Sequence, residues 1–191
     1  MNLKDLSFTK DWTLFLDRDG VISQRITDGY VTRWENFRFL DGVLEALSGL
    51  SKIFGHIIIV SNQQGIGKGL MSADELREID KMMKNQVALA GGCIDASYYS
   101  PYLASDDHPD RKPSTGMGLK AKADFPLIDF SRSVMVGDAE SDMEFGKRLG
   151  MITVLISEED QPDIKSADFH YRSLLDFSRQ SSVVSQQSTT T

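Results

Sequence analysis

Two aspartates one residue apart, Asp17 and Asp19, are the first residues whose types and spacing suggest chemistry. They follow the apolar run Thr13–Leu16, and Gly20 comes directly after them. Alternate side chains of an extended segment point the same way, so we expect the two carboxylates to lie side by side. Adjacent carboxylates repel each other unless a cation lies between them, and Mg2+ prefers oxygen ligands. The alternative is an ordinary Asp-Gly turn after a strand.

Ser61 and Asn62 follow a second apolar run, residues 57–60. A hydroxyl and nearby N–H groups at the end of a strand are suited to phosphate oxygens, so both residues are predicted to bind phosphate or substrate. The glycines in residues 65–69 match neither common nucleotide-binding loop pattern, which argues against a nucleotide site.

Arg111 and Lys112 lie directly before Pro113 and are suited to an anion. Arginine offers a planar fork of donors, whereas lysine offers a point charge. The alternative is a pair of ordinary surface charges.

A further acid, Asp138, follows the apolar run 133–136 and Gly137. Asp142 lies about one helical turn beyond it. We expect Asp138 to join Asp17 and Asp19 as a metal ligand and Asp142 to brace the loop or Lys112 from behind.

Apolar runs alternate with helix-like periodicities along the chain, which is typical of an α/β fold with a parallel sheet and helices on both faces. Open sheets of this kind place their chemistry at the carboxyl ends of the strands, where the acids above are expected. Residues 23–40 fit neither pattern and are predicted to form a functional loop. One domain is expected over residues 1–177. The polar stretch 178–191 is predicted to be disordered.

Composition restricts the class of protein. Among 191 residues there is one cysteine, Cys93, so no internal disulfide framework is expected, and a reducing cytoplasm is the natural location. The apolar runs are too short for a bilayer, and residues 1–5 do not resemble a signal segment, so no membrane partner is expected. The net charge of −7 argues against nucleic acid and allows a small phosphorylated ligand. A monomer or small homo-oligomer is expected.

The order of the motifs resembles the haloacid-dehalogenase superfamily of phosphatases. Asp-x-Asp-Gly, Ser-Asn, Arg-Lys-Pro and Gly-Asp-x-x-x-Asp follow one another between about residues 14 and 154. Several stretches resemble the histidinol-phosphatase-type branch, which includes heptose-bisphosphate phosphatases: residues 17–22, 28–31, 35–43, 61–66 and 111–113. The stretch 28–43 is more similar to the heptose-bisphosphate members, and this branch lacks a large cap domain.

Zinc is not expected, because the chain departs from this branch in one loop. Many members carry Cys-x-His and then Cys-x-Cys before Arg-Lys-Pro. The corresponding residues here are Ser100, Tyr102, His108 and Asp110, which do not suit a tetrahedral zinc site. An acidic loop exposed to solvent is the favoured interpretation of residues 106–110.

The resemblance implies a Rossmann-like three-layer fold and a Mg2+-dependent phosphatase acting on a small sugar phosphate. In this scheme Asp17 is the nucleophile that becomes an aspartyl-phosphate, and Asp19 is the acid and base. The metal would be held by Asp17, Asp19 through its backbone carbonyl, and Asp138. Ser61, Asn62 and Lys112, together with Arg111, Asp28 and Tyr30, would bind phosphate or substrate.

The expected substrate is a heptose 1,7-bisphosphate, and three alternatives to this function remain open. Histidinol phosphate is one alternative. A phosphotransferase or mutase using the same aspartyl-phosphate is another, and it would transfer phosphate to an added alcohol faster than to water. The last is a non-catalytic binding protein on the same fold, against which the complete set of site residues argues.

Overall fold

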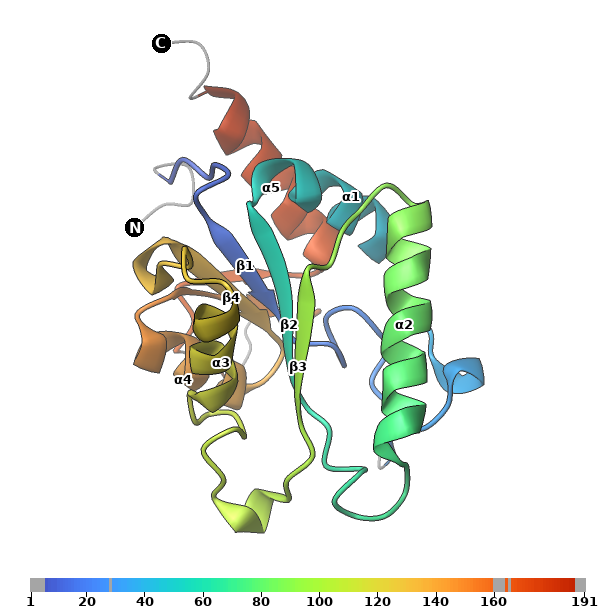
Figure 1. Ribbon diagram of the computed structural model, residues 1–191. Coiled ribbons are helices and arrows are strands. Elements are labelled where there is room, and N and C mark those ends of the chain that lie inside the picture. Colours follow the sequence, from blue (N-terminus) through green and yellow to red (C-terminus); the bar gives the residue numbers. More distant parts are fainter. Residues whose placement is uncertain (1–5, 28, 160–163, 165, 188–191) are drawn as a thin grey trace.

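A parallel six-stranded sheet forms the centre of the protein (Figure 1), in the order β3-β2-β1-β4-β5-β6. The computed structural model describes residues 6–27, 29–159, 164 and 166–187. The strands are β1 (Thr13–Leu16), β2 (His56–Asn62), β3 (Ala96–Ser100), β4 (Ser133–Gly137), β5 (Ile152–Ile156) and β6 (Phe169–Tyr171). The α-helices are α1 (Val43–Ile53), α2 (Ala73–Leu89), α3 (Gly116–Asp124), α4 (Glu140–Leu149) and α5 (Leu174–Gln187). Short 3-10 helices are η2 (Trp34–Asn36), η3 (Ala104–Asp106) and η4 (Phe130–Arg132).

Helices cover both faces of the sheet, and the side chains of β1 show how. Leu14 and Leu16 belong to the core that also contains buried residues of α1, α2 and α5. Phe15 points the other way, into the core formed with α3 and α4. Because both faces are buried, the central strands consist of continuous apolar runs. The predicted three-layer α/β fold is confirmed, and no inserted cap domain is present in the described part of the chain.

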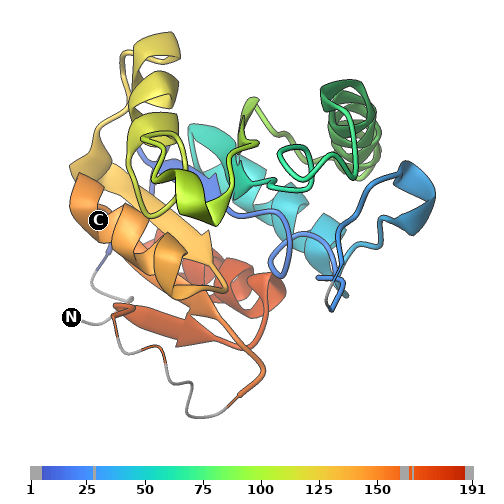
Figure 2. The same cartoon turned by 90° about the horizontal axis from the view of Figure 1, so that it is seen from below.

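The strands β1, β2 and β4 end at the same edge of the sheet. All three are parallel, and the last residue of β1, Leu16, pairs with Ile59 on one side and Val136 on the other. The strands β2 and β3 lie on one side of β1, and the later strands β4, β5 and β6 lie on the other. The strand order therefore reverses at β1. Ligands bind at such points in open α/β sheets. Figure 2 views this edge, where the loops after the strands gather.

A capping box fixes the start of α2. The amide of Glu75 donates to the Ser72 hydroxyl at 3.1 Å, and the amide of Ser72 donates to the Glu75 carboxylate at 2.7 Å. The two residues thereby satisfy amides that the helix itself leaves unpaired. Glu75 has this structural role.

The predicted disorder of residues 178–191 is wrong for residues 178–187, which continue α5. Ser178 and Ser181 are buried. The Ser178 hydroxyl donates to the carbonyl of Ala46 in α1 at 3.2 Å, and that of Ser181 donates to a carbonyl one turn back. Small serines allow close helix approach while backbone carbonyls satisfy their hydroxyls. A sequence with few apolar residues can therefore still pack against the fold.

None of the helices in the described residues is both long and apolar enough to cross a lipid bilayer.

Candidate active site

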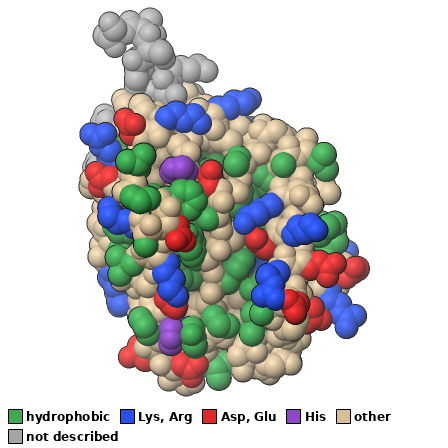
Figure 3. All heavy atoms as spheres, viewed as in Figure 1, with side chains coloured by type: hydrophobic (Ala, Val, Ile, Leu, Met, Phe, Trp, Pro, Cys, Tyr) green, Lys and Arg blue, Asp and Glu red, His purple; other side chains and the backbone are tan. Residues whose placement is uncertain are grey.

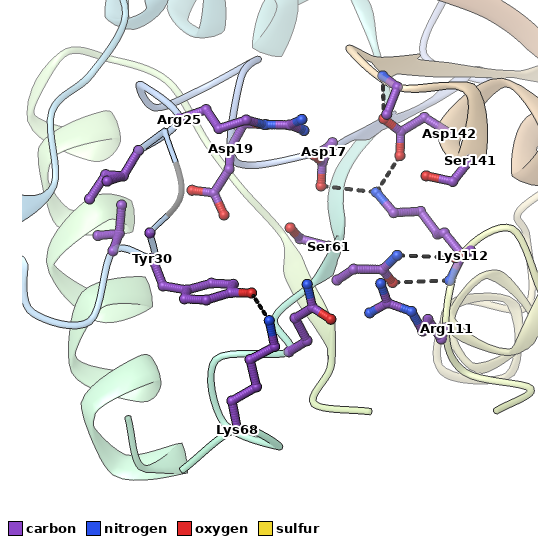
Figure 4. A pocket seen from close by; sticks show the side chains of 16 residues that line it. Asp17, Asp19, Arg25, Tyr30, Ser61, Lys68, Arg111, Lys112, Ser141 and Asp142 are labelled. Atoms are coloured by element: carbon purple, nitrogen blue, oxygen red, sulfur yellow. Dashed lines mark hydrogen bonds and ion pairs between the residues drawn. The ribbon is translucent and has the colours of Figure 1, made fainter. Parts of the chain in front are cut away.

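A buried lysine between two aspartates forms the centre of the site (Figure 4). Lys112 Nζ lies 2.9 Å from Asp17 Oδ1 and 2.6 Å from Asp142 Oδ1. It also donates to the carbonyl of Val60 at 2.6 Å. Burial alone would lower the pKa of Lys112, but the charges of Asp142 and Asp17 outweigh it and raise the pKa. The lysine therefore remains an ammonium, and all three of its N–H groups have acceptors.

Asp17 is placed by the end of β1, because its amide continues the ladder to Val136 in β4 at 2.9 Å. Only 6% of Asp17 is exposed to solvent. Burying a charged group is unfavourable unless it is paired, and Lys112 pairs with Asp17. The ion pair therefore fixes the Asp17 carboxylate at the end of β1.

Asp142 lies at the start of α4 and supports the site from behind. Its Oδ2 accepts hydrogen bonds from the amides of Asp138 at 3.2 Å and Ala139 at 3.1 Å. A side chain at Gly137 would overlap Asp142. Both oxygens of Asp142 are thus occupied by Lys112 and the loop amides, and its role as a brace of the site stays a prediction.

The side chains of Asp17, Asp138 and Asp142 form a cluster in which ligand oxygens lie within 4.8 Å of one another. Burial and the neighbouring charge of Asp17 raise the pKa of Asp138 to about 7. Gly20 adopts a φ of 94°, and any side chain there would overlap the Asp138 carboxylate. This set of crowded carboxylates, which a divalent cation would relieve, fits a Mg2+ site. Elsewhere in the described residues no other group of three such side chains is close enough to hold a metal.

Arg25 already places a positive charge beside this cluster. Its Nη2 lies 2.8 Å from Asp138 Oδ1 and 3.4 Å from the carbonyl oxygen of Asp19. Those two oxygens belong to residues that the sequence predicts as metal ligands. Arg25 was not predicted as a site residue, because only the folded loop after β1 brings it to Asp138.

The carboxylate of Asp19 is held by polar side chains around it. Arg18 donates to it through Nε at 3.1 Å and Nη2 at 2.9 Å. Gln63 and Ser23 add donors at 2.7 and 2.9 Å. Burial would raise the pKa of Asp19, but the Arg18 charge and these hydrogen bonds together lower it. Asp19 is an ionised carboxylate in this arrangement.

The amide of Asn62 holds the backbone of Lys112 from both sides. Its Nδ2 donates to the Lys112 carbonyl at 3.1 Å, and its Oδ1 accepts from the Lys112 amide at 3.0 Å. Ser61, buried next to it, accepts a hydrogen bond from Gln63 at 3.1 Å. Asn62 thus positions a site cation, and direct substrate contact by Ser61 and Asn62 stays a prediction.

Tyr30 and Lys68 lie across the pocket from Asp142, and Arg111 lies beside Lys112 (Figure 4). Lys68 Nζ donates to the Tyr30 hydroxyl at 2.8 Å, and Arg111 Nη1 donates to the carbonyl of Tyr102 at 2.9 Å. Lys68 was missed from the sequence, although it lies in the polar glycine-rich loop after β2. Asp28, predicted to bind substrate, lies outside the described residues.

One cleft of about 540 Å³ brings these groups together. The predicted site residues that line it are Asp17, Asp19, Tyr30, Ser61, Asn62, Arg111, Lys112 and Asp142. Asp138 is not part of the lining and instead lies in the carboxylate cluster beside it. Carboxylates that could attack or hold a metal therefore share a cleft with cations that suit phosphate oxygens.

The comparisons with known proteins agree with this chemistry. Residues 6–179 match the family described as polynucleotide kinase 3 phosphatase. A D-glycero-alpha-D-manno-heptose-1,7-bisphosphate 7-phosphatase of Burkholderia mallei is 41% identical over 172 residues, covering 83% of this chain and 86% of the relative. A beta-anomer enzyme of Haemophilus influenzae is 37% identical, covering 70% of this chain and 74% of the relative.

A solved structure with a similar fold is the D,D-heptose 1,7-bisphosphate phosphatase of B. bronchiseptica, complexed with magnesium and phosphate. It has a TM-score of 0.78 and 24% sequence identity, and the match covers 88% of this chain and 97% of that one. The family match spans nearly the whole chain, and the two relatives are 41% and 37% identical over the aligned residues. The chain belongs to the haloacid-dehalogenase superfamily of phosphatases, in the branch that contains the heptose-1,7-bisphosphate 7-phosphatases.

Proposed function

We propose that this protein is a Mg2+-dependent phosphatase that removes the 7-phosphate of D-glycero-D-manno-heptose 1,7-bisphosphate. The observation that carries the proposal is the buried Asp17–Lys112–Asp142 array, with Lys112 within 2.9 Å of both carboxylates, at the floor of a cleft lined by further cations. The names of the 37–41% identical relatives support this choice of substrate.

In the first step an oxygen of Asp17 attacks the phosphorus, the bond from phosphorus to the leaving oxygen breaks, and the phosphoryl group becomes attached to Asp17. Lys112 and Ser61 hold the phosphoryl oxygens. The three N–H groups of Lys112 already have acceptors. Its contact with the phosphoryl group therefore requires the bond to Asp17 to be shared or replaced as the transfer proceeds.

Asp19 donates a proton to the leaving alcohol and then removes one from the water that hydrolyses the aspartyl-phosphate. The ionised state favoured by Arg18 and Gln63 suits the second of these tasks. Proton donation in the first requires the carboxylate to turn from Arg18 toward the substrate and to take up a proton before the leaving alcohol departs.

Asp17, Asp138 and the backbone carbonyl of Asp19 would hold Mg2+, with Asp142 bracing the loop behind them. When bound, the ion offsets the negative charge of the nucleophile and the phosphoryl group.

The second phosphate of the substrate would bind at Arg111 and Lys68. Neither side chain has a carboxylate within ion-pair distance among the described residues, whereas Arg25 and Lys112 both do. Lys68 donates to the Tyr30 hydroxyl, and Tyr30, Lys68 and Arg111 all line the same cleft. Two cations in the cleft that have no carboxylate partner favour a substrate with an additional anionic group.

A small phosphorylated molecule suits the surface better than nucleic acid does. Acidic and basic side chains are interspersed over the face shown in Figure 3, and the net charge is −7. Phosphate-backbone binding requires a basic face. A cytoplasmic location and a monomer or small homo-oligomer are part of the same proposal.

Phosphate release tests the proposal directly. The purified protein should release phosphate from both anomers of heptose 1,7-bisphosphate in Mg2+, and EDTA should stop the reaction. Histidinol phosphate and common hexose phosphates serve as competing substrates, and an added alcohol tests for transfer. A kcat/KM for histidinol phosphate above the values for both anomers of heptose bisphosphate would contradict the proposed substrate. Transfer of phosphate to the alcohol faster than hydrolysis would indicate a phosphotransferase.

A further inference from the structure

Two aromatic rings stack on each other in the loop between β3 and α3. The centroids of Tyr102 and His108 are 3.3 Å apart, and the ring planes differ by 14°. Neither residue lines the cleft of the active site. The stack joins two points of the loop that are six residues apart, so it closes the segment between them.

Both members of the stack hold Arg111. The backbone carbonyl of Tyr102 accepts a hydrogen bond from Arg111 Nη1 at 2.9 Å. The carbonyl of His108 accepts one from the Arg111 amide at 2.9 Å. The Tyr102 ring therefore fixes the residue that binds the Arg111 guanidinium. The His108 ring fixes the residue that binds the Arg111 backbone amide.

Further contacts keep the stack in place. His108 Nδ1 accepts the amide of Asp110 at 3.1 Å, and the carboxylate of Asp110 accepts from Lys120 Nζ in α3 at 2.5 Å. On the other side, the carbonyl of Pro101 accepts the amide of Gly67 at 3.1 Å. The loop is thus attached both to α3 and to the segment after β2 that carries Lys68.

Lys112 has a separate support, although it is the next residue in the chain. Asn62 holds its backbone at both the amide and the carbonyl, and Asp17 and Asp142 hold its ammonium. A change at the stack should therefore move Arg111 and leave Lys112 in place.

We propose that Tyr102 and His108 act as an aromatic clasp that positions Arg111 for the end of the substrate remote from the reacting phosphate. The role in substrate binding rests on the function proposed above. A guanidinium displaced by about 1 Å loses the geometry of a bidentate anion contact, so loosening the clasp weakens binding of a second phosphate. His108 and Tyr102 are positioning residues in this proposal.

Steady-state kinetics on two substrates test the positioning. His108→Ala should raise KM for a sugar bisphosphate by about tenfold and leave kcat/KM for a simple aryl phosphate unchanged within about twofold. His108→Phe keeps a ring that can stack and should restore most of the lost affinity. Equal losses on both substrates, or no rescue by phenylalanine, would overturn the proposal.

A double-mutant cycle separates the clasp from a general effect on the fold. In an Arg111→Ala background, His108→Ala should add little, because the side chain that the clasp positions is gone. Additive effects of the two substitutions would show that His108 acts through something other than Arg111.

Amide hydrogen exchange gives a measurement that does not depend on turnover. Exchange at the Arg111 amide should be faster in His108→Ala than in the wild type. His108→Phe keeps the stacking ring but loses the acceptor for the Asp110 amide, so its exchange should lie between the two and nearer the wild type. If the wild-type protein hydrolyses no sugar bisphosphate, the proposed function fails while this comparison still tests the clasp. Unchanged exchange in His108→Ala would show that the clasp does not hold Arg111.

Discussion

The guanidinium of Arg25 lies 2.8 Å from a carboxylate oxygen of Asp138, and the same nitrogen is 3.4 Å from the carbonyl oxygen of Asp19. Both oxygens belong to the set proposed to hold Mg2+. Arg25 comes from the loop after β1 and is more than half exposed, so it can leave without disturbing the core. Arg25 and Mg2+ should therefore compete for the same oxygens.

Thermal unfolding with and without Mg2+ tests this site. A ligand that binds only the folded protein stabilises it by about 2.7 kcal/mol at a hundred times its Kd, so Mg2+ should raise the Tm of the wild type. Asp138→Ala should lose this increase. Arg25→Gln should keep it and reach it at lower Mg2+ concentrations. If the Tm of Asp138→Ala rises with Mg2+ as much as that of the wild type, Asp138 is not a ligand of the metal.

Replacing Asp17 by asparagine tests the covalent mechanism. The substitution preserves the shape of the side chain and removes the anionic nucleophile, so kcat should fall by about three powers of ten or more. Lys112 also loses one of its two carboxylate partners, so the Tm of the variant should be recorded in parallel. A folded variant that retains more than about a tenth of wild-type turnover would contradict the mechanism.

Phe177 tests the contribution of α5 to the fold. It is fully buried, and its ring contacts those of Phe8 and Tyr171. Phe177→Ala should lower the free energy of unfolding by about 3–5 kcal/mol, measured in urea. Ser182→Ala, on the partly exposed side of the same helix, is the matched control and should change it by less than about 0.5 kcal/mol. A similarly small effect of Phe177→Ala would mean that α5 is not integral to the core.

The sheet and most helices were predictable because their signal is local. A strand buried on both faces must be a continuous apolar run, and residues 57–60 are one. The tail was different, since the burial of Ser178 depends on α1 lying against it, and nothing within residues 178–187 indicates that contact. Composition alone therefore predicted disorder where the fold provides a partner.

The same distinction applies to the site. Asp17, Asp138 and Asp142 could be predicted because each follows a strand whose carboxyl end must lie at the same edge of the sheet. Arg25 could not, since the long loop after β1 carries it to the cleft, and Lys68 was missed although its loop directly follows β2. The sequence also predicted Asn62 as a phosphate ligand, and it offered no sign that both atoms of its amide hold the backbone of Lys112.

Arg111 and Lys112 are neighbours in the chain whose predicted roles differ, and their alanine variants should separate those roles. Lys112 is buried between Asp17 and Asp142. Arg111 is only partly buried and lines the same cleft as Lys68, which has no carboxylate partner among the described residues. In the proposed function, the charge of the transferring phosphoryl group would develop next to Lys112, and the remote phosphate would lie at Arg111.

Lys112→Ala should therefore lower kcat on every phosphate ester, because it removes a cation from the reacting centre and leaves two buried carboxylates without it. Arg111→Ala should instead raise KM for a sugar bisphosphate, with a much smaller effect on an aryl phosphate that lacks a second anionic group. Lys68→Ala should follow the Arg111 pattern if both cations bind the same phosphate. Measuring kcat and KM for the three variants on both substrates decides the matter, and equal losses on the two substrates for Arg111→Ala would show that Arg111 does not recognise the remote end.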